Sequence, residues 1–331
     1  MIISQTPLRI SLLGGGTDFR EYYRNEDGFV LSAAIDKYIF VIVKERFDDM
    51  IYVNYSKKER VSSIDEIEHD LVREAMRKTG VENGIELTML ADIPSEGSGL
   101  GSSSSLTVGL LNALYNYNGV QVTAEQLAQE ACDIEIEICK KPIGKQDQYI
   151  AAYGGVSTFT FQKSGRVISE RINLSNKNLQ YLGANLLLFY TGKTRQSSDI
   201  LAEQKSNTSN GINTEYLTKI KKLAIKGYGS FLKGNFDIVG ELIKKNWEYK
   251  KLLSSKISNG EISGMCEKAI KAGALGAKIS GAGGGGFLLV YCESEKQNKL
   301  KKALKDYREM PFLLEQHGSK IIFNYMSYSW K

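Results

Sequence analysis

Histidine is scarce in this sequence, and the few cysteines are widely spaced. The 331 residues include two histidines and four cysteines, and no two cysteines form a CxxC pair. His69 and His317 lie in charged segments that we expect to be exposed, so neither a His-based catalytic triad nor a His-ligated zinc site is expected. The cysteines lie in apolar segments, which predicts reduced core thiols in a cytoplasmic protein.

Long apolar runs and dense basic clusters are also missing. No apolar stretch is long enough to cross a bilayer, and the first residues lack the basic start and small-residue cleavage site of a signal peptide. The net charge is only +5, and the lysines are scattered over predicted helix faces. We therefore expect no membrane or nucleic-acid partner, and chemistry that uses carboxylates, hydroxyls, Lys, Arg and backbone groups.

Strand-like and helix-like segments alternate along the chain, as is typical of an α+β protein. Residues 2–13 and 34–45 are rich in β-branched and aromatic residues and predict strands. Apolar spacing predicts helices over 103–117 and 124–138. The polar stretch 173–181 is the predicted boundary between two domains.

Three glycine-rich clusters are the most unusual feature of the sequence. They are "LLGGGTD" (12–18), "GSGLGSSSS" (97–105) and "SGAGGGGF" (280–287). The middle cluster leads directly into the predicted helix 103–117. Backbone N–H groups in glycine turns and at a helix N-terminus form a site for anions, so this cluster suits a triphosphate. A flexible loop with a serine cap is the alternative reading.

Two common phosphate-binding motifs do not fit. "TGKT" at 191–194 supplies the end of a Walker A loop, but Leu187 stands where the first glycine is required. "GAGGGG" at 281–286 is followed by a predicted strand, whereas a Rossmann fingerprint needs a helix to hold the pyrophosphate. A glycine-rich hairpin that brings backbone close to a ligand is the simpler reading of that cluster.

The three clusters together resemble the three motifs of the GHMP superfamily of small-molecule kinases. "PLRISLLGGGTDF" resembles the first motif, "PSEGSGLGSSSS" the second and "KISGAGGGGF" the third. The resemblance implies an N-terminal domain like ribosomal protein S5 domain 2, over residues 1–180. It also implies a ferredoxin-like C-terminal domain over 181–331, with ATP bound between the two.

Within this superfamily, "GKQDQYIAAYGG" and "YTGKTRQSS" look most like the D-glycero-D-manno-heptose 7-phosphate kinases. That likeness implies ATP-dependent phosphorylation of the anomeric hydroxyl, giving a 1,7-bisphosphate for nucleotide-heptose and surface-glycan synthesis. Galactokinases carry an acidic residue where Gly15 stands here, which argues against galactose. A free-sugar C1 kinase of the fucokinase type and a catalytically silent sugar sensor stay open as alternatives. Either a monomer or a homodimer is compatible with the sequence.

The resemblance assigns the catalytic base to Asp147, in "PIGKQDQY". Lys145 stands beside it and could hold the carboxylate in its ionised form. An aspartate that only caps a turn is the alternative. Arg9 lies in an otherwise apolar strand, where a buried arginine requires a partner. A role for Arg9 in orienting the base or stabilising the transition state fits the same motif, and an edge-strand arginine facing water is the alternative.

Several residues are expected to bind ATP and magnesium. Hard oxygen ligands suit Mg²⁺, and the resemblance points to Ser103 and Glu135, with Glu137 as a rival two residues along the same helix. The residues predicted to bind the nucleotide phosphates are Gly97, Gly99, Leu100, Gly101, Ser102, Ser103, Ser104 and Ser105.

The sugar is expected to lie against the first and third motifs. Asp18 is predicted to accept hydrogen bonds from sugar hydroxyls, although it could simply close an Asx turn. Lys193 and Arg195 lie two residues apart near a helix start and suit a second phosphate on the sugar, although they could also be solvated surface cations. The other residues predicted to contact the sugar are Gly15, Gly16, Thr17, Gly283 and Gly284.

Overall fold

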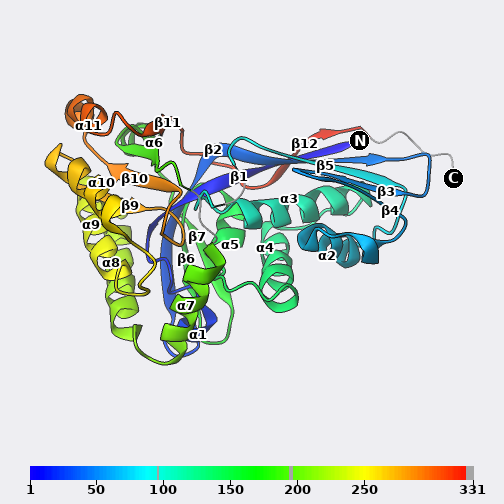
Figure 1. Ribbon diagram of the computed structural model, residues 1–331, viewed down its shortest axis with the longest axis horizontal. Helices are drawn as coiled ribbons and strands as arrows, with labels where there is room; N and C mark the ends of the chain where they lie inside the picture. Colours follow the sequence, from blue (N-terminus) through cyan, green and yellow to red (C-terminus); the bar gives the residue numbers. More distant parts are fainter. Residues whose placement is uncertain (95–96, 194–196, 326–331) are drawn as a thin grey trace.

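Two β-sheets with helices packed against them build the molecule, which confirms the predicted α+β class (Figure 1). The computed structural model describes residues 1–94, 97–193 and 197–325. The strands are β1 (Ile2–Leu13), β2 (Gly28–Glu45), β3 (Ile51–Asn54), β4 (Lys58–Val61), β5 (Ile85–Ala91), β6 (Val156–Phe161), β7 (Val167–Arg171), β8 (Leu186–Tyr190), β9 (Gly276–Ile279), β10 (Phe287–Tyr291), β11 (Arg308–Met310) and β12 (Lys320–Asn324).

The helices alternate with these strands and include one π-helix, η2, and two short 3₁₀ turns, η1 and η3. They are α1 (Arg20–Tyr23), η1 (Ile64–Glu66), α2 (Asp70–Thr79), α3 (Ser102–Tyr117), α4 (Ala124–Cys132), η2 (Asp133–Ile138), α5 (Gln146–Tyr153), α6 (Asn176–Ala184), α7 (Ser197–Ser209), α8 (Thr214–Leu232), α9 (Asp237–Lys250), α10 (Gly260–Lys271), η3 (Ser294–Lys296) and α11 (Gln297–Ala303).

The larger sheet is built around the long strand β2. Its path is β12-β1-β2-β5-β3-β4, and β6 and β7 continue from the other half of β2. β1 and β2 are antiparallel, and Arg9 pairs with Ala34 in their register. Strand β12 pairs with the outer edge of β1, so a segment close to the C-terminus completes the sheet that the first strand begins.

Helix α3 packs along this sheet and carries the middle glycine cluster at its N-terminus. Figure 1 shows α2, α3, α4 and α5 on the same face of the sheet. The close approach depends on Gly109, because a Cβ there would lie 2.8 Å from Thr6 Oγ1. Ser4 also donates a hydrogen bond to the Gly109 carbonyl at 2.8 Å. Helix α3 is therefore held close against β1.

The smaller sheet has the order β11-β8-β10-β9, and every neighbouring pair is antiparallel. Helices α8, α9 and α10 lie beside it in Figure 1. Lys278 of β9 is 2% exposed and donates to the Leu12 carbonyl of β1 at 2.9 Å. This buried hydrogen bond links the two sheets behind the first and third glycine clusters.

Three local expectations were wrong. The polar stretch 173–181 is not a gap, because α6 begins within it and Ser175 caps that helix by accepting from Asn178 N at 3.3 Å. The predicted helix 124–138 changes to a π-helix at Asp133. His69 is not exposed, since its side chain is only 18% exposed and packs edge-on against Tyr55.

Two further features bear on the earlier expectations. All four cysteines are free; three are buried and Cys139 is half-buried. In the part of the chain that the structure describes, no helix combines the length and hydropathy required to span a membrane. The division into domains at residue 180 stays a prediction.

Candidate active site

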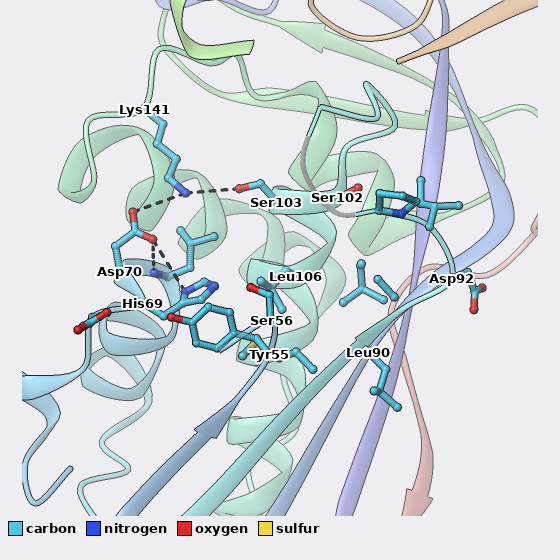
Figure 2. A pocket seen from close by; sticks show the side chains of 17 residues that line it. Tyr55, Ser56, His69, Asp70, Leu90, Asp92, Ser102, Ser103, Leu106 and Lys141 are labelled. Atoms are coloured by element: carbon cyan, nitrogen blue, oxygen red, sulfur yellow. Dashed lines mark hydrogen bonds and ion pairs between the residues drawn. The ribbon is translucent and has the colours of Figure 1, made fainter. Parts of the chain in front are cut away.

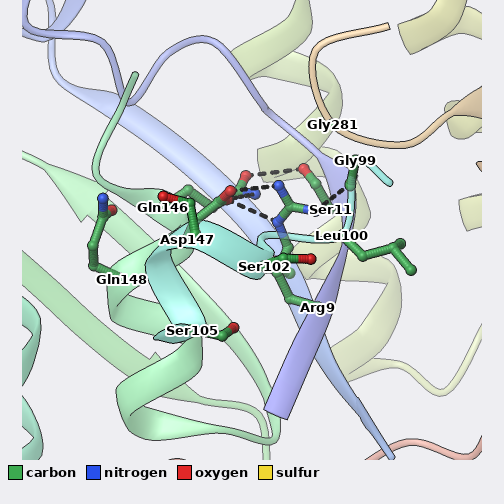
Figure 3. A network of polar contacts seen from close by, with 12 residues as sticks. Arg9, Ser11, Gly99, Leu100, Ser102, Ser105, Gln146, Asp147, Gln148 and Gly281 are labelled. Atoms are coloured by element: carbon green, nitrogen blue, oxygen red, sulfur yellow. Dashed lines mark hydrogen bonds and ion pairs between the residues drawn. The ribbon is translucent and has the colours of Figure 1, made fainter. Parts of the chain in front are cut away.

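Arg9 joins three segments at the centre of the molecule (Figure 3). Its Nε and Nη2 donate to the two carboxylate oxygens of Asp147 at 2.7 and 2.6 Å. Its Nη1 donates to the Gly99 carbonyl at 2.7 Å. Strand β1 places the side chain there, and Arg9 is only 4% exposed. Two parallel bonds between a guanidinium and a carboxylate fix orientation as well as charge.

Asp147 lies where two cavities meet. It stands in the first turn of α5, and its side chain is 27% exposed. One of the two cavities is bordered by the second and third glycine clusters, and the other by the first cluster. Lys145, which was expected to neutralise Asp147, instead donates to the Gly165 carbonyl at 3.1 Å. The cation that pairs with Asp147 is Arg9.

The cavity between the second and third glycine clusters, of about 340 Å³, lies at the N-terminus of α3. We name it the phosphate cavity. Of the residues predicted to bind nucleotide phosphates, Leu100 and Ser105 do not line it; Leu100 is fully buried and Ser105 donates to the Pro7 carbonyl at 2.8 Å. The predicted residues that do line it are Gly97, Gly99, Gly101, Ser102, Ser103 and Ser104.

Glycine is required where the clusters touch. Gly99 and Gly281 both have positive φ, and a Cβ on Gly281 would lie 2.6 Å from the Gly99 Cα. Gly101 faces the ion pair, since a Cβ there would lie 3.2 Å from Arg9 Cγ and 3.4 Å from Asp147 Oδ2. Bare backbone therefore lines the cavity, with its N–H groups accessible to an anion.

Ser103 and Glu135 form a pair of oxygen donors at the edge of this cavity. Ser103 Oγ donates to Glu135 Oε1 at 2.6 Å, and Gln148 donates to Oε2 at 2.6 Å. Glu135 is fully buried, and its burial raises the pKa of the carboxyl. Glu137 instead faces away, is half exposed and pairs with Arg20 at 3.1 Å.

The chemistry of this pair fits Mg²⁺. Both donors are hard oxygens, which magnesium prefers, and the nucleotide phosphates usually supply further ligands. Glu135 has no ion pair with Lys or Arg among the described residues, so a cation would offset the cost of burying its charge. The described residues contain no group of three or more His, Cys, Asp or Glu side chains able to hold a metal alone.

The second cavity, of about 90 Å³, lies between the first glycine cluster and Asp147. We name it the sugar cavity. Gly15, Gly16 and Asp18 line it as predicted. Asp18 accepts from the Gly16 and Gln146 N–H groups at 2.8 and 3.1 Å, and burial is the main cause that raises its pKa.

Thr17 has a structural position instead of lining the sugar cavity. Its hydroxyl donates to the Gly14 carbonyl at 2.8 Å and accepts from Phe29 N at 3.0 Å. It closes the loop that presents Gly15, Gly16 and Asp18.

Lys250 is a polar residue of the sugar cavity that the sequence analysis missed. It ends α9, is 8% exposed and donates to the Gly281 carbonyl. Burial, with a further effect from Arg9, lowers the pKa of Lys250 to about 8. A signal existed, because Ile243, Trp247 and Lys250 share the buried face of an amphipathic helix, where a lysine is unusual.

Lys193 and Arg195 were predicted to bind a second phosphate on the sugar. Arg195 lies outside the described residues, and Lys193 does not line the sugar cavity. Lys193 is 54% exposed, forms an ion pair with Glu261 and lines a separate small cavity. Gly284 lines that same small cavity, whereas Gly283 lines the phosphate cavity.

A larger cavity of about 820 Å³ adjoins the phosphate cavity and shares Ser102, Ser103 and Lys141 with it (Figure 2). Tyr55 and His69 line it together with several apolar side chains. Its volume is within the range of small-molecule sites. The sequence analysis missed it, because its walls come from segments far apart in the chain.

Known proteins are similar to this chain over most of its length. A model of the GHMP kinases N terminal domain matches residues 67–155, and a model of the GHMP kinases C terminal region matches residues 220–309. The D-glycero-alpha-D-manno-heptose 7-phosphate kinase of Campylobacter jejuni is 33% identical over 319 residues, which cover 92% of this chain and 93% of that enzyme.

Two other relatives cover nearly the whole chain. The L-fucokinase/L-fucose-1-P guanylyltransferase of Bacteroides fragilis is 27% identical over 94% of this chain and 37% of that enzyme. The crystal structure of a D-glycero-D-manno-heptose 1-phosphate kinase from Bacteroides thetaiotaomicron superposes with a TM-score of 0.81 at 25% identity, covering 98% of this chain and 100% of that one.

Proposed function

This chain belongs to the GHMP kinase family and is an ATP-dependent phosphotransferase acting on a sugar hydroxyl; from this premise we propose that its substrate is D-glycero-D-manno-heptose 7-phosphate. The γ-phosphoryl group of ATP is transferred to the anomeric hydroxyl, giving the 1,7-bisphosphate and ADP. We assign this product to nucleotide-heptose and surface-glycan synthesis.

The position of Asp147 between the phosphate cavity and the sugar cavity carries the mechanistic part of the proposal. Asp147 accepts the proton of the attacking hydroxyl while the oxygen of that hydroxyl bonds to the γ-phosphorus of ATP and ADP leaves. Arg9 holds the carboxylate in one orientation through two hydrogen bonds and offsets its charge. The loop amides and the N-terminus of α3 bind the nucleotide phosphates.

Ser103 and Glu135 would hold Mg²⁺, which when bound neutralises charge on the phosphates. Lys141 Nζ lies 3.5 Å from Ser103 Oγ and adds a second cation on the same side. The nucleoside would occupy the cavity that Tyr55 and His69 line (Figure 2). In the sugar cavity, Asp18 accepts from sugar hydroxyls, and Lys250 is placed to donate to the sugar.

A phosphorylated heptose is favoured as substrate by two relatives that cover nearly all of this chain. One is named a heptose 7-phosphate kinase and the other a heptose 1-phosphate kinase, and of these two sugar phosphates only the 7-phosphate has a free anomeric hydroxyl. The likeness to L-fucokinase supports a free-sugar C1 kinase as the second candidate. In both cases the acceptor hydroxyl would lie against Asp147.

A substrate panel analysed by ³¹P NMR tests the proposal. The panel contains free hexoses and heptoses, including L-fucose, and their phosphates, each with ATP and Mg²⁺. We expect turnover of heptose 7-phosphate and a new anomeric phosphate signal beside the retained 7-phosphate signal. Preferential turnover of L-fucose, or phosphate transfer to another hydroxyl of the heptose, would overturn it.

A further inference from the structure

A basic cavity opens beside the sugar cavity. Its volume is about 340 Å³, and Asp18 and Ile143 line both this cavity and the sugar cavity. Four cationic side chains line it: Arg20, Lys140, Lys145 and Lys205. They come from α1, the segment around η2, and α7; Figure 1 shows α1 and α7 side by side.

Two of the four cations already have carboxylate partners. Arg20 lies 3.1 Å from Glu137, and Lys205 lies 3.3 Å from Glu21. These two ion pairs neutralise Glu137 and Glu21, which also line the cavity.

Lys140 and Lys145 have no carboxylate within ion-pairing distance in the described ranges. The Nζ of Lys145 donates to the Gly165 carbonyl at 3.1 Å and lies 5.4 Å from the centre of the Tyr23 ring. Lys140 is exposed and lines the cavity mouth. Four cations and three carboxylates (Asp18, Glu21 and Glu137) line the cavity, so its side chains leave a net positive charge that a bound anion would neutralise.

The backbone conformation of Lys140 indicates a functional role for its side chain. Its φ is +53°, the sole positive φ of a non-glycine residue in the described chain. The residue follows Cys139, the C-cap of the π-helix η2, and Lys141 N donates to the Glu135 carbonyl at 2.9 Å. Glycine adopts this left-handed conformation without strain, and strained residues cluster at functional sites. A lysine at this position therefore carries a conformational cost.

We propose that the basic cavity binds the phosphate monoester at the far end of the sugar substrate, with Lys140 and Lys145 as its charged ligands. This inference rests on the proposed function. With the anomeric hydroxyl against Asp147, the sugar passes Asp18, which lines both cavities, and its phosphate reaches the two lysines. Charge-assisted hydrogen bonds to phosphate oxygens supply the preference for a phosphorylated sugar over a free one.

This site differs from the one predicted around Lys193. That residue is paired with Glu261 and lines a small cavity with Gly284 and Gly285. Gly285 also lines the phosphate cavity, so Lys193 lies on the nucleotide side of Asp147. Asp18 lines the sugar cavity and the basic cavity but not the phosphate cavity, so we place the far end of the sugar on the side of Lys140 and Lys145.

Steady-state kinetics with heptose 7-phosphate and free heptose tests the assignment. Lys145→Met keeps the aliphatic part of the side chain against Tyr23 and removes the charge. Lys140→Gly removes the charge and also relieves the positive φ. Each variant should raise KM for the 7-phosphate by about 10- to 100-fold and leave KM for free heptose and ATP nearly unchanged. Lys193→Met and Arg195→Ala are the comparison variants.

Thermal unfolding separates binding from folding. Lys140→Gly should unfold at the same temperature as the wild type or a higher one, because glycine tolerates the left-handed backbone. A weaker substrate interaction in a protein of undiminished stability would then be a loss of binding.

The outcomes distinguish the two proposals. If the wild type used free heptose as well as its 7-phosphate, the proposed function would be overturned whatever the variants do. If the wild type preferred the 7-phosphate and Lys140→Gly and Lys145→Met both kept that preference, only the basic cavity would lose its assignment. Loss of the preference in Lys193→Met or Arg195→Ala alone would likewise place the phosphate at the other site.

Discussion

At the scale of single residues, the pair Arg9–Asp147 accounts for most of what the site can do. A buried arginine whose three guanidinium nitrogens each donate a hydrogen bond cannot turn away from the carboxylate without leaving charge unpaired. Asp147 therefore has one orientation, and both of its oxygens lie near the junction of the phosphate and sugar cavities. Catalysis by proton transfer depends on such a fixed position.

Asp147→Asn should reduce kcat by roughly 10²- to 10⁴-fold, because an amide cannot accept the hydroxyl proton. Nucleotide binding should persist, since the loop amides and Ser103 are unchanged. Single-turnover kinetics and fluorescent-nucleotide titration measure the two effects. The control is Asp133→Asn, at an exposed position on η2. A variant that keeps more than about a tenth of wild-type kcat would remove Asp147 from the role of base.

Lys250 should give the protein a distinctive dependence of stability on pH. Asp18 and Asp147 raise its pKa and Arg9 lowers it, but burial dominates and lowers the pKa from the ordinary 10.5 to about 8. Between these values the unfolded chain holds a proton that the folded chain has lost. The unfolded state then binds more protons, so the contribution of Lys250 to stability rises with pH across this window.

Urea unfolding of the wild type and of Lys250→Met, from about pH 7 to about pH 10, measures this contribution. The free energy of unfolding of the wild type minus that of the variant should stay level up to about pH 8 and then rise. Lys251→Met, at the exposed neighbouring position, should show a flat difference. A flat difference for Lys250→Met as well would mean that the lysine keeps its ordinary pKa.

At the scale of elements, the π-helix η2 connects the proposed metal ligand Glu135 with the proposed phosphate ligand Lys140. Glu135 faces Ser103 from its middle, Glu137 faces Arg20 on the outside, and Lys140 follows its end. π-helical turns often occur at functional sites. The change of helix type is invisible in the sequence, because apolar spacing over 124–138 fits an ordinary helix.

Ser103→Ala and Glu135→Gln should each raise the Mg²⁺ concentration needed for half-maximal activity. Each change removes one oxygen ligand or its negative charge while preserving the fold around α3. Glu137→Gln is the matched control, two residues further along the same element and paired with Arg20. Mg²⁺ titration of the initial rate is the measurement. A shift in the Glu137 variant alone would assign the metal to the other glutamate.

Elements were predicted well where sequence pattern dictates local structure. Strand β1 has the predicted bounds, and α3 begins one residue before the predicted 103. The stretch 173–181 was misjudged because its polar residues cover an exposed helix, α6, whose outer face needs no apolar side chains. Helices of this kind depend on caps such as Ser175, which composition alone does not reveal.

The site was predictable in part for a similar physical reason. Arg9, Asp18 and Asp147 stand in motifs whose residue types are odd for their local structure, so the sequence marks them. Lys141 is an ordinary lysine in a lysine-rich segment, and Lys250 is marked in the sequence only by its place on the apolar face of α9; tertiary packing brings both to the cavities. The same holds for the basic cavity, which collects cations from three distant segments.

At the scale of the whole molecule, the two sheets meet through backbone at the reaction centre. Gly281, beside the smaller sheet, touches Gly99, beside the larger one, and Lys250 holds the Gly281 carbonyl. No side chain separates the two loops. The alignment of the phosphate and sugar cavities therefore depends on this contact.

Gly281→Ala should separate the loops, because its Cβ would lie 2.6 Å from the Gly99 Cα. Gly80→Ala is the matched control: its φ of +72° is close to the +68° of Gly281, but no atom lies within 4 Å of its added Cβ. Both variants should lose about 1–2 kcal/mol of stability from the left-handed backbone. Only Gly281→Ala should also lower kcat/KM, by an expected tenfold or more. Equal kcat/KM in both variants would show that the loop contact is dispensable.

The pairing of β12 with β1 has a consequence during synthesis. Ile321 pairs with Ser4, so 317 residues (321 − 4) separate the partners. At about 5–20 residues per second, a ribosome needs roughly 15 to 60 s to make the missing strand. Throughout that time the outer edge of β1 is an open template for another nascent chain. The speed of translation therefore controls how long each new molecule is exposed to aggregation, and hence the yield of folded enzyme.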